Sequence, residues 1–239
     1  MTSNSMRKLK LLVLAVIAGV LMCSASAFAD AILDFGMIAP SPGTISYAGG
    51  AAPLLGINIQ VDNVTGLGTN LNNNQSRNLF GGLLNWTTGP STGPWTWGNG
   101  GSITITGGVD LNNNGIFDAG DIPPGTTLLS GAFGSAQVVP TILGNFKVSL
   151  GNFTDAKDPT LLAFFGLPNV IPYIGNFNLS FMLGGNVASP NAFSTASPAG
   201  GRVLSGDLVN TPTPEPGTLV LLGSGLLGAL ALARRKAKK

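Results

Sequence analysis

Short segments that alternate apolar and polar residues recur along this chain, and clusters of Gly, Pro and Asn separate them. Successive side chains of a strand point to opposite faces, so a period of two predicts a strand with one buried face and one wet face. The alternation is clearest in residues 57–62, where Ile57, Ile59 and Val61 are the apolar set. The other segments that predict strands are 44–47, 83–87, 102–106, 127–131, 146–150, 177–183 and 202–209.

The residues between these segments indicate the fold class. The chain has 35 Gly and 16 Pro among 239 residues, and both residue types favour turns over helix interiors. We therefore expect an all-β fold, an antiparallel β-sandwich of which a jelly roll is one form, with an open barrel as the alternative. One apolar run, 161–165, is ambiguous. Asp158 as cap, Pro159 and Gly166 as stop predict a short helix, whereas the same run also suits a buried strand.

Charge is distributed unevenly, because eight of the 12 Lys and Arg residues lie within the first ten and the last six positions. Between Asp30 and Thr213, four cations stand against nine Asp and no Glu. The middle of the chain is therefore acidic. This excludes the basic face that nucleic-acid binding requires.

The main domain lacks the side chains that most enzymes use as bases and nucleophiles. The sequence contains no His, its one cysteine is Cys23, and its one Glu is Glu215. Disulfides, thiolate metal sites and His-activated nucleophiles are therefore excluded there, and we expect no enzymatic activity. A secreted glycosidase using two Asp is the weaker alternative. Asp155 and Asp158 are close in sequence, but they are better interpreted as turn and cap residues.

Residues 1–29 have the three parts of a secretory signal peptide. Cations precede an apolar run at 11–22, and small residues end in Ala27-Phe28-Ala29, which predicts cleavage after Ala29. The apolar run of about 12 residues is too short to span a bilayer comfortably, which takes about 20. Lipidation at Cys23 is the alternative, disfavoured because Met22 stands where such signals carry a small residue.

The carboxyl end, residues 211–239, has the features of a membrane tail behind an exported β domain at 30–210. Prolines at 212, 214 and 216 hold the chain extended as a tether. Residues 217–233 are uncharged and mostly apolar, about 25 Å long as a helix, which suffices for one transmembrane helix. The five cations that follow would stay in the cytoplasm.

The order of these tail residues is specific. Pro214, Glu215 and Pro216, a short Gly-containing apolar helix, and then Arg234 and Arg235 resemble the PEP-CTERM sorting signal of Gram-negative bacteria. The resemblance implies export, removal of the signal peptide by signal peptidase, and processing of an inner-membrane-anchored precursor by the protease exosortase. It also implies delivery to the cell surface or the extracellular (biofilm) matrix. A permanent single-pass anchor is the alternative.

One segment, 110–121, has the spacing of a 12-residue calcium loop, with Gly115 at the position of the sharp turn. It resembles the loops of EF-hand-like and dockerin-like extracellular modules. Only three of its oxygen ligands are carboxylates, so we expect a weak structural site with a dissociation constant of about 10⁻⁴–10⁻³ M. The expected Ca²⁺ ligands are Asp110, Asn112, Asn114, the carbonyl of Ile116, Asp118 and Asp121.

The residues that flank this segment favour a β-hairpin loop over a helix-loop-helix. A predicted strand precedes it, and Pro123 and Pro124 after it prevent a helix from continuing. The alternative to a calcium site is a plain Asn/Asp/Gly turn whose side chains bond their own backbone.

Three tryptophans, Trp86, Trp95 and Trp97, lie close together in a Gly/Pro/Thr-rich stretch, and Trp95 and Trp97 are expected to share a strand face. Such rings can stack on sugars, and aromatic residues also serve as core. The leading hypothesis is therefore a cell-surface or matrix structural or adhesive protein. An exopolysaccharide-binding module is the alternative.

Overall fold

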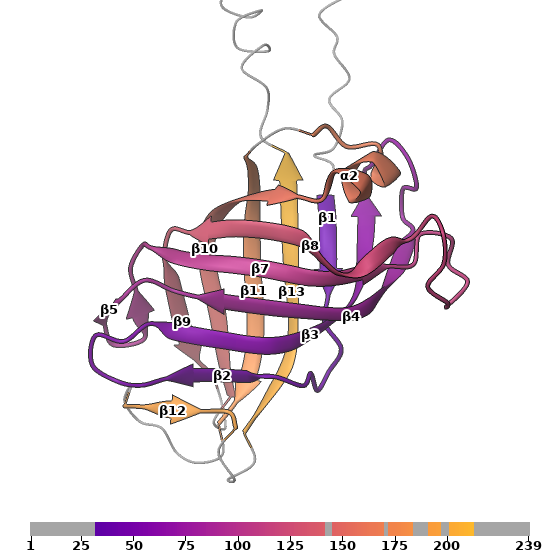
Figure 1. Ribbon diagram of the computed structural model, residues 1–239. Coiled ribbons are helices and arrows are strands. Elements are labelled where there is room, and N and C mark those ends of the chain that lie inside the picture. The colour runs from indigo at the N-terminus through magenta and orange to yellow at the C-terminus, as the bar shows by residue number, and fades with distance from the viewer. Residues whose placement is uncertain (1–31, 142–144, 170–171, 184–190, 197–200, 213–239) are drawn as a thin grey trace, which may run out of the picture. The chain divides into compact units, whose positions relative to one another are not determined.

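The computed structural model describes residues 32–141, 145–169, 172–183, 191–196 and 201–212 (Figure 1). The predicted signal peptide at 1–29, the predicted transmembrane helix at 217–233, and the sorting residues Pro214, Glu215, Pro216, Arg234 and Arg235 lie outside this set. Within these ranges, no helix has the length and apolar character needed to cross a membrane.

The described chain is almost entirely strand, with one short helix, α2 (Pro159–Phe165). The strands are β1 (Ile32–Gly36), β2 (Thr44–Tyr47), β3 (Leu54–Leu67), β4 (Ser76–Thr87), β5 (Ser91–Gly93), β6 (Thr96–Trp97), β7 (Gly101–Val109), β8 (Ile122–Phe133), β9 (Ala136–Pro140), β10 (Asn145–Lys157), β11 (Tyr173–Met182), β12 (Phe193–Ser194) and β13 (Arg202–Pro212). The all-β prediction is confirmed, and each segment predicted to be a strand lies in or overlaps one.

Eight of these strands form one antiparallel sheet that closes on itself. The order is β11-β13-β1-β3-β4-β7-β8-β10, and β10 pairs in turn with β11. Strands β9, β6 and β5 continue from the Asn145 end of β10. Strand β2 pairs with β3, and β12 pairs with β2. Figure 1 shows β4, β7 and β8 crossing in front of β11 and β13 at a steep angle.

The expected two-sheet sandwich or jelly roll is therefore wrong, because the structure has a single closed barrel. Its strands are long, 14 residues in β3 and 13 in β10, and their pairings shift register at several points. Such bulges increase local twist and bend a sheet, which allows the first and last strands of a long sheet to meet. Closure also pairs strand edges that a sandwich would leave open.

The core fills the inside of this closed sheet. Along β11, buried residues alternate with outward-facing ones, so that Tyr173, Phe177, Leu179 and Phe181 all point inward. Aromatic side chains bury the largest areas and dominate the packing. For example, the ring of Trp86 on β4 lies 5.9 Å from that of Phe177 on β11. The predicted period-two pattern of residues 177–183 thus reflects a real inward face.

Among Ile57, Ile59 and Val61, which the sequence predicts to share a buried face, Ile57 points outward. Ile57 is 43% exposed, whereas Ile59 and Val61 are buried as expected. The pairing of β3 with β4 shifts between Gly56 and Ile59, and Asn58 has a φ of 52°. An extra residue at a bulge breaks the alternation, so it resumes only after Asn58.

The ambiguous run after β10 is helical. The side chain of Asp158 accepts a hydrogen bond from the backbone N–H of Leu161 at 2.9 Å, Pro159 occupies the first helical position, and Gly166 ends the helix with a φ of 66°. These are the cap and stop signals that the sequence carries. Phe165 is buried and packs against Gly66, where a Cβ atom would collide with its ring.

Candidate functional site

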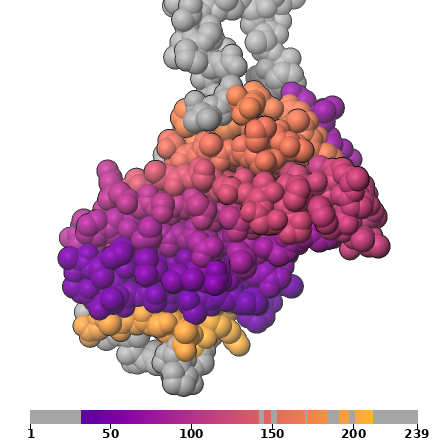
Figure 2. Space-filling view, in the orientation of Figure 1, coloured from indigo at the N-terminus to yellow at the C-terminus, as the bar shows by residue number. Residues whose placement is uncertain are grey.

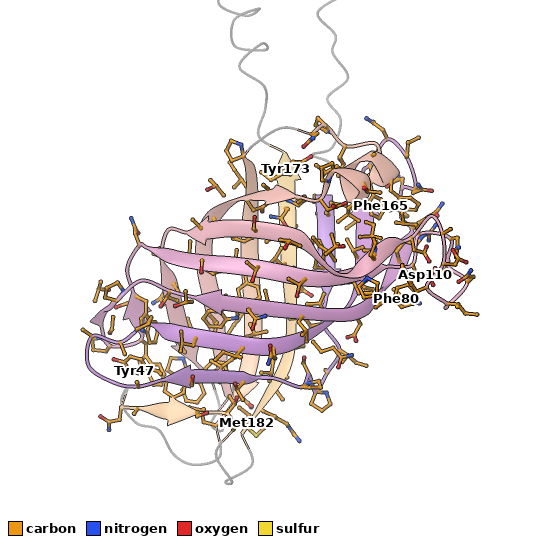
Figure 3. The ribbon with its side chains drawn as sticks, viewed as in Figure 1. Tyr47, Phe80, Asp110, Phe165, Tyr173 and Met182 are labelled. Carbon is orange, nitrogen blue, oxygen red and sulfur yellow. The ribbon has the colours of Figure 1, made fainter. Side chains whose placement is uncertain are left out.

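The predicted calcium segment is the loop between β7 and β8, and those two strands pair with each other. Figure 2 shows this segment standing out from the side of the molecule, and Figure 3 shows Asp110 at its base. The prediction of a β-hairpin loop in place of a helix-loop-helix is confirmed. All six predicted ligand residues therefore lie in one loop.

Two carboxylates hold the backbone of this loop. Asp110 is fully buried, and its two oxygens accept hydrogen bonds from the backbone N–H groups of Asn114, at 3.1 Å, and Gly115, at 2.7 Å. The oxygens of Asp121 accept from the N–H groups of Leu111, at 2.8 Å, and Asp118, at 3.1 Å. Gly115 has a φ of 80°, a conformation that glycine adopts without steric cost. The loop is therefore ordered by its own side chains.

The third carboxylate faces two amides. Asp118 accepts hydrogen bonds from the side-chain nitrogens of Asn112, at 2.9 Å, and Asn114, at 2.7 Å. In the part of the chain that the structure describes, no three His, Cys, Asp or Glu side chains are grouped as a metal site. The donor set fits calcium in chemical type, but binding would require both amides to turn their oxygens toward the ion. Calcium binding stays a prediction.

The tryptophans lie in or against the core. Trp86 and Trp97 are 3% and 1% exposed, and the indole nitrogen of Trp97 donates to the carbonyl oxygen of Ala52 at 3.2 Å. Trp95 precedes β6 with a φ of 59°, and its ring lies 5.1 Å from that of Phe146. It sits in the turn between β5 and β6, so the expectation that it shares a strand face with Trp97 is wrong. Neither Trp86 nor Trp97 has an open face for a sugar ring.

Sequence reasoning missed a buried polar cluster inside the sheet, formed by Asp155 and Lys157 of β10, Tyr173 of β11 and Asn210 of β13. One oxygen of Asp155 forms an ion pair with Lys157 Nζ, and the other accepts a hydrogen bond from Asn210 Nδ2. All four residues are buried. Figure 3 shows Tyr173 at the end of the sheet near α2. The interpretation of Asp155 as a turn residue is wrong, whereas Asp158 is a helix cap as predicted.

Burial dominates the electrostatics of this cluster. It raises the pKa of the Asp155 carboxyl and lowers the pKa of Lys157 to about 8, and the attraction between the two groups opposes both shifts only in part. Lys157 Nζ lies 3.9 Å from the centroid of the Tyr173 ring, and the Tyr173 hydroxyl donates to the carbonyl of Pro168 at 2.6 Å. Burial, with the nearby Asp155, raises the pKa of Tyr173 to about 12.

The cluster could be found only in part from the sequence. The two-residue spacing of Asp155 and Lys157 places both on one face of a strand, the face that also carries Phe153. Asn210 gives no such signal, because only the pairing of β10 with β11 and of β11 with β13 brings it near.

The last strand continues into the predicted tether. Pairing of β13 with β11 extends to Thr211, opposite Ile174, and Pro212, opposite Tyr173. Strand β13 therefore extends two residues beyond the predicted domain boundary at 210.

Comparison with known proteins identifies one region. A family model described as the PEP-CTERM protein-sorting motif matches residues 212–236, which confirms the resemblance expected from Pro214, Glu215, Pro216, Arg234 and Arg235. No curated protein and no solved structure matches the chain. The matched region begins at the final residue of β13.

Proposed function

We propose that this chain, an exosortase substrate by its PEP-CTERM sorting motif, acts as a structural or adhesive protein of the cell surface or extracellular matrix. The motif at 212–236 carries the proposal. It implies that the protein is exported and that a membrane-associated precursor is processed by exosortase. The β domain would then be the part that reaches its final location.

The composition of the domain supports a non-enzymatic role. Between residues 30 and 210 the sequence has no His, Cys or Glu, so Cys nucleophiles and nucleophiles activated by a His base cannot be assembled there. Trp86 and Trp97 are buried in the core, which removes the main argument for the alternative, an exopolysaccharide-binding module. The weaker alternative of a two-Asp glycosidase gains nothing from Asp158, which caps α2.

Replacing residues 214–216 with three alanines in the full-length precursor should block sorting. The apolar and basic parts of the tail remain, so we expect the protein to accumulate in the membrane fraction with an intact carboxyl end. Cell fractionation with mass analysis of both termini measures this outcome. Thr213→Ala is the matched control, because it changes the neighbouring residue and leaves the Pro-Glu-Pro sequence intact. Equal release of the unchanged protein from a strain without exosortase would contradict the proposal.

We also propose that the 110–121 loop binds calcium weakly, as a structural ion. The support is the position of Asp110, Asp118 and Asp121 in one hairpin loop with a glycine at the sharp turn. Asn112 and Asn114 stand in the same loop, and their side-chain oxygens could reach an ion once the amides turn. Extracellular calcium is abundant enough to occupy sites with dissociation constants of about 10⁻⁴–10⁻³ M.

Calcium at about ten times its dissociation constant should raise the free energy of unfolding by about 1–2 kcal/mol relative to chelator. Thermal melts with and without calcium measure the difference. Asp118→Ala should abolish it, and this variant is preferable to one at Asp110, whose carboxylate holds the loop backbone even without an ion. Asp207→Ala, an exposed position on β13, is the control and should keep the response. Melting curves of the unchanged protein that coincide in calcium and chelator would exclude the site.

A further inference from the structure

A carboxyl group holds an amine and a carboxamide together inside the closed sheet. Asp155 contacts Lys157 Nζ through one oxygen and Asn210 Nδ2 through the other. The three side chains come from β10 and β13, which are neighbours of β11 on opposite sides. We propose that Lys157 and Asn210 join in an intramolecular isopeptide bond, with Asp155 as the proton-transferring catalytic residue. This inference does not depend on the proposed role in sorting or adhesion.

The amine is placed to act as a nucleophile. Its side chain is fully buried, and its nitrogen lies 3.9 Å from the centre of the Tyr173 ring. Burial disfavours the charged amine and lowers its pKa to about 8, while burial also raises the pKa of Asp155. Both shifts favour transfer of one proton from Lys157 to Asp155, which would leave a neutral amine beside a neutral carboxylic acid. Only the neutral amine has the lone pair that attack requires.

The carboxamide is placed to be attacked. Asn210 is 1% exposed, and its side-chain oxygen has no hydrogen-bond partner. A buried acceptor without a donor is costly, and a protonated Asp155 supplies a donor close to it. The nitrogen of the same amide, the leaving group, already contacts Asp155.

A glycine on the intervening strand makes this approach feasible. Gly175 of β11 stands in register between Phe153 of β10 and Asn210 of β13. A Cβ atom at Gly175 would collide with Asn210 Nδ2 and with the Phe153 ring. The missing side chain thus lets Asn210 reach across β11 toward Asp155 and Lys157.

The reaction balances without an oxidant or reductant. The lone pair of Lys157 Nζ forms a bond to Cγ of Asn210 while Asp155 gives its proton to the amide oxygen. Asp155 then takes a proton from the attacking nitrogen and passes it to Asn210 Nδ2. The Cγ–Nδ2 bond breaks and ammonia leaves, while the hydroxyl proton returns to the Asp155 carboxylate and the carbonyl re-forms. One C–N bond is made and one is broken, and Asp155 is regenerated as the acid.

Peptide mapping of the full chain, purified from the producing cell and digested with trypsin in denaturant, tests the bond. Trypsin cuts after Lys147, Lys157 and Arg202, so an unlinked chain yields the fragments 148–157 and 158–202 and a fragment beginning at 203. The isopeptide bond blocks cleavage at Lys157. We expect one branched species, in which the fragment 148–202 is joined to the fragment that begins at 203. Its mass should equal the sum of these two fragments minus one ammonia molecule. Fragments of unreduced mass with no branched species would overturn the proposal.

Variants locate the bond. Lys157→Met, Asn210→Ala and Asp155→Ala should each abolish the branched species, the first two by removing a reactant and the third by removing the proton carrier. Lys147→Met is the matched control, because Lys147 is exposed on the same strand, and the branched species should persist with a new amino-terminal boundary. A branched species that survives Asn210→Ala would contradict the assignment. If a variant does not fold, the tryptic digest of the unchanged chain still shows whether the isopeptide bond is present.

Discussion

Gly175→Ala should lower the free energy of unfolding by about 3 kcal/mol, the upper end of the range for overpacked cores. Gly175 lies on β11 between two buried side chains, and a methyl group there would collide with the ring of Phe153 and the amide of Asn210. Neither neighbour can move outward, because Phe153 packs against Phe133 with ring centroids 5.4 Å apart and Asn210 is enclosed by the sheet. Chemical denaturation followed by tryptophan fluorescence measures the loss.

The same substitution should also remove the branched tryptic species, since it pushes the Asn210 amide away from Asp155. Gly93→Ala is the matched control. The nearest atom to a Cβ at Gly93 is the hydroxyl of Thr96, at 3.2 Å, and this half-buried side chain stands at the start of β6. We expect a change within about 0.5 kcal/mol there. A Gly175→Ala protein as stable as the Gly93→Ala protein would show that the interior accommodates the extra group.

Relative to a chain in which the isopeptide bond has not formed, Asp155→Ala should lower the free energy of unfolding by about 3–5 kcal/mol, because removing one partner of the buried Lys157–Asp155 ion pair leaves the other charge uncompensated. Lys157 would keep only the face of Tyr173 as a partner, and Asn210 would lose its acceptor. Denaturant unfolding at neutral pH measures the loss of stability. At this pH an unpaired buried lysine either stays charged at a cost in desolvation free energy or loses its proton.

Adding Lys157→Met to Asp155→Ala tests this reason directly. Methionine retains most of the buried apolar volume and carries no charge, so the double variant should be more stable than Asp155→Ala alone. Both proteins lack a reactant or the catalyst for the isopeptide bond, so the comparison does not depend on that bond. If the double variant is no more stable than Asp155→Ala alone, the loss of stability comes from altered packing and not from the uncompensated lysine charge.

Local signals in the sequence account for most of the elements. The alternation of residues 177–183 predicts the inward face of β11, and Asp158, Pro159 and Gly166 predict the start and end of α2. The hairpin around residues 110–121 and the sorting motif were also accessible, because strand flanks, prolines and short motifs are local features.

Features that depend on the pairing of strands far apart in the sequence could not be predicted from the sequence. The closed sheet requires β10 to meet β11 as well as β8, which no single segment encodes. The bulge at Asn58 turns Ile57 outward because β4 takes up a shifted register beside it. The Trp86 ring is buried because Gly56 and Phe177 come to lie against it from other strands. In each case the neighbours, and not the residue type, decide exposure.

The place of β13 has a consequence for the order of events during export. This strand lies between β1 and β11, so β1 keeps one edge unpaired until residues 202–212 have crossed the membrane. The pairing of the first and last strands is a non-local contact, the kind that forms slowly during folding. The tail that exosortase reads follows immediately in the chain. The strand that closes the sheet and the sorting motif are therefore adjacent in the chain, so the sheet lacks its closing strand until the segment beside the motif is available.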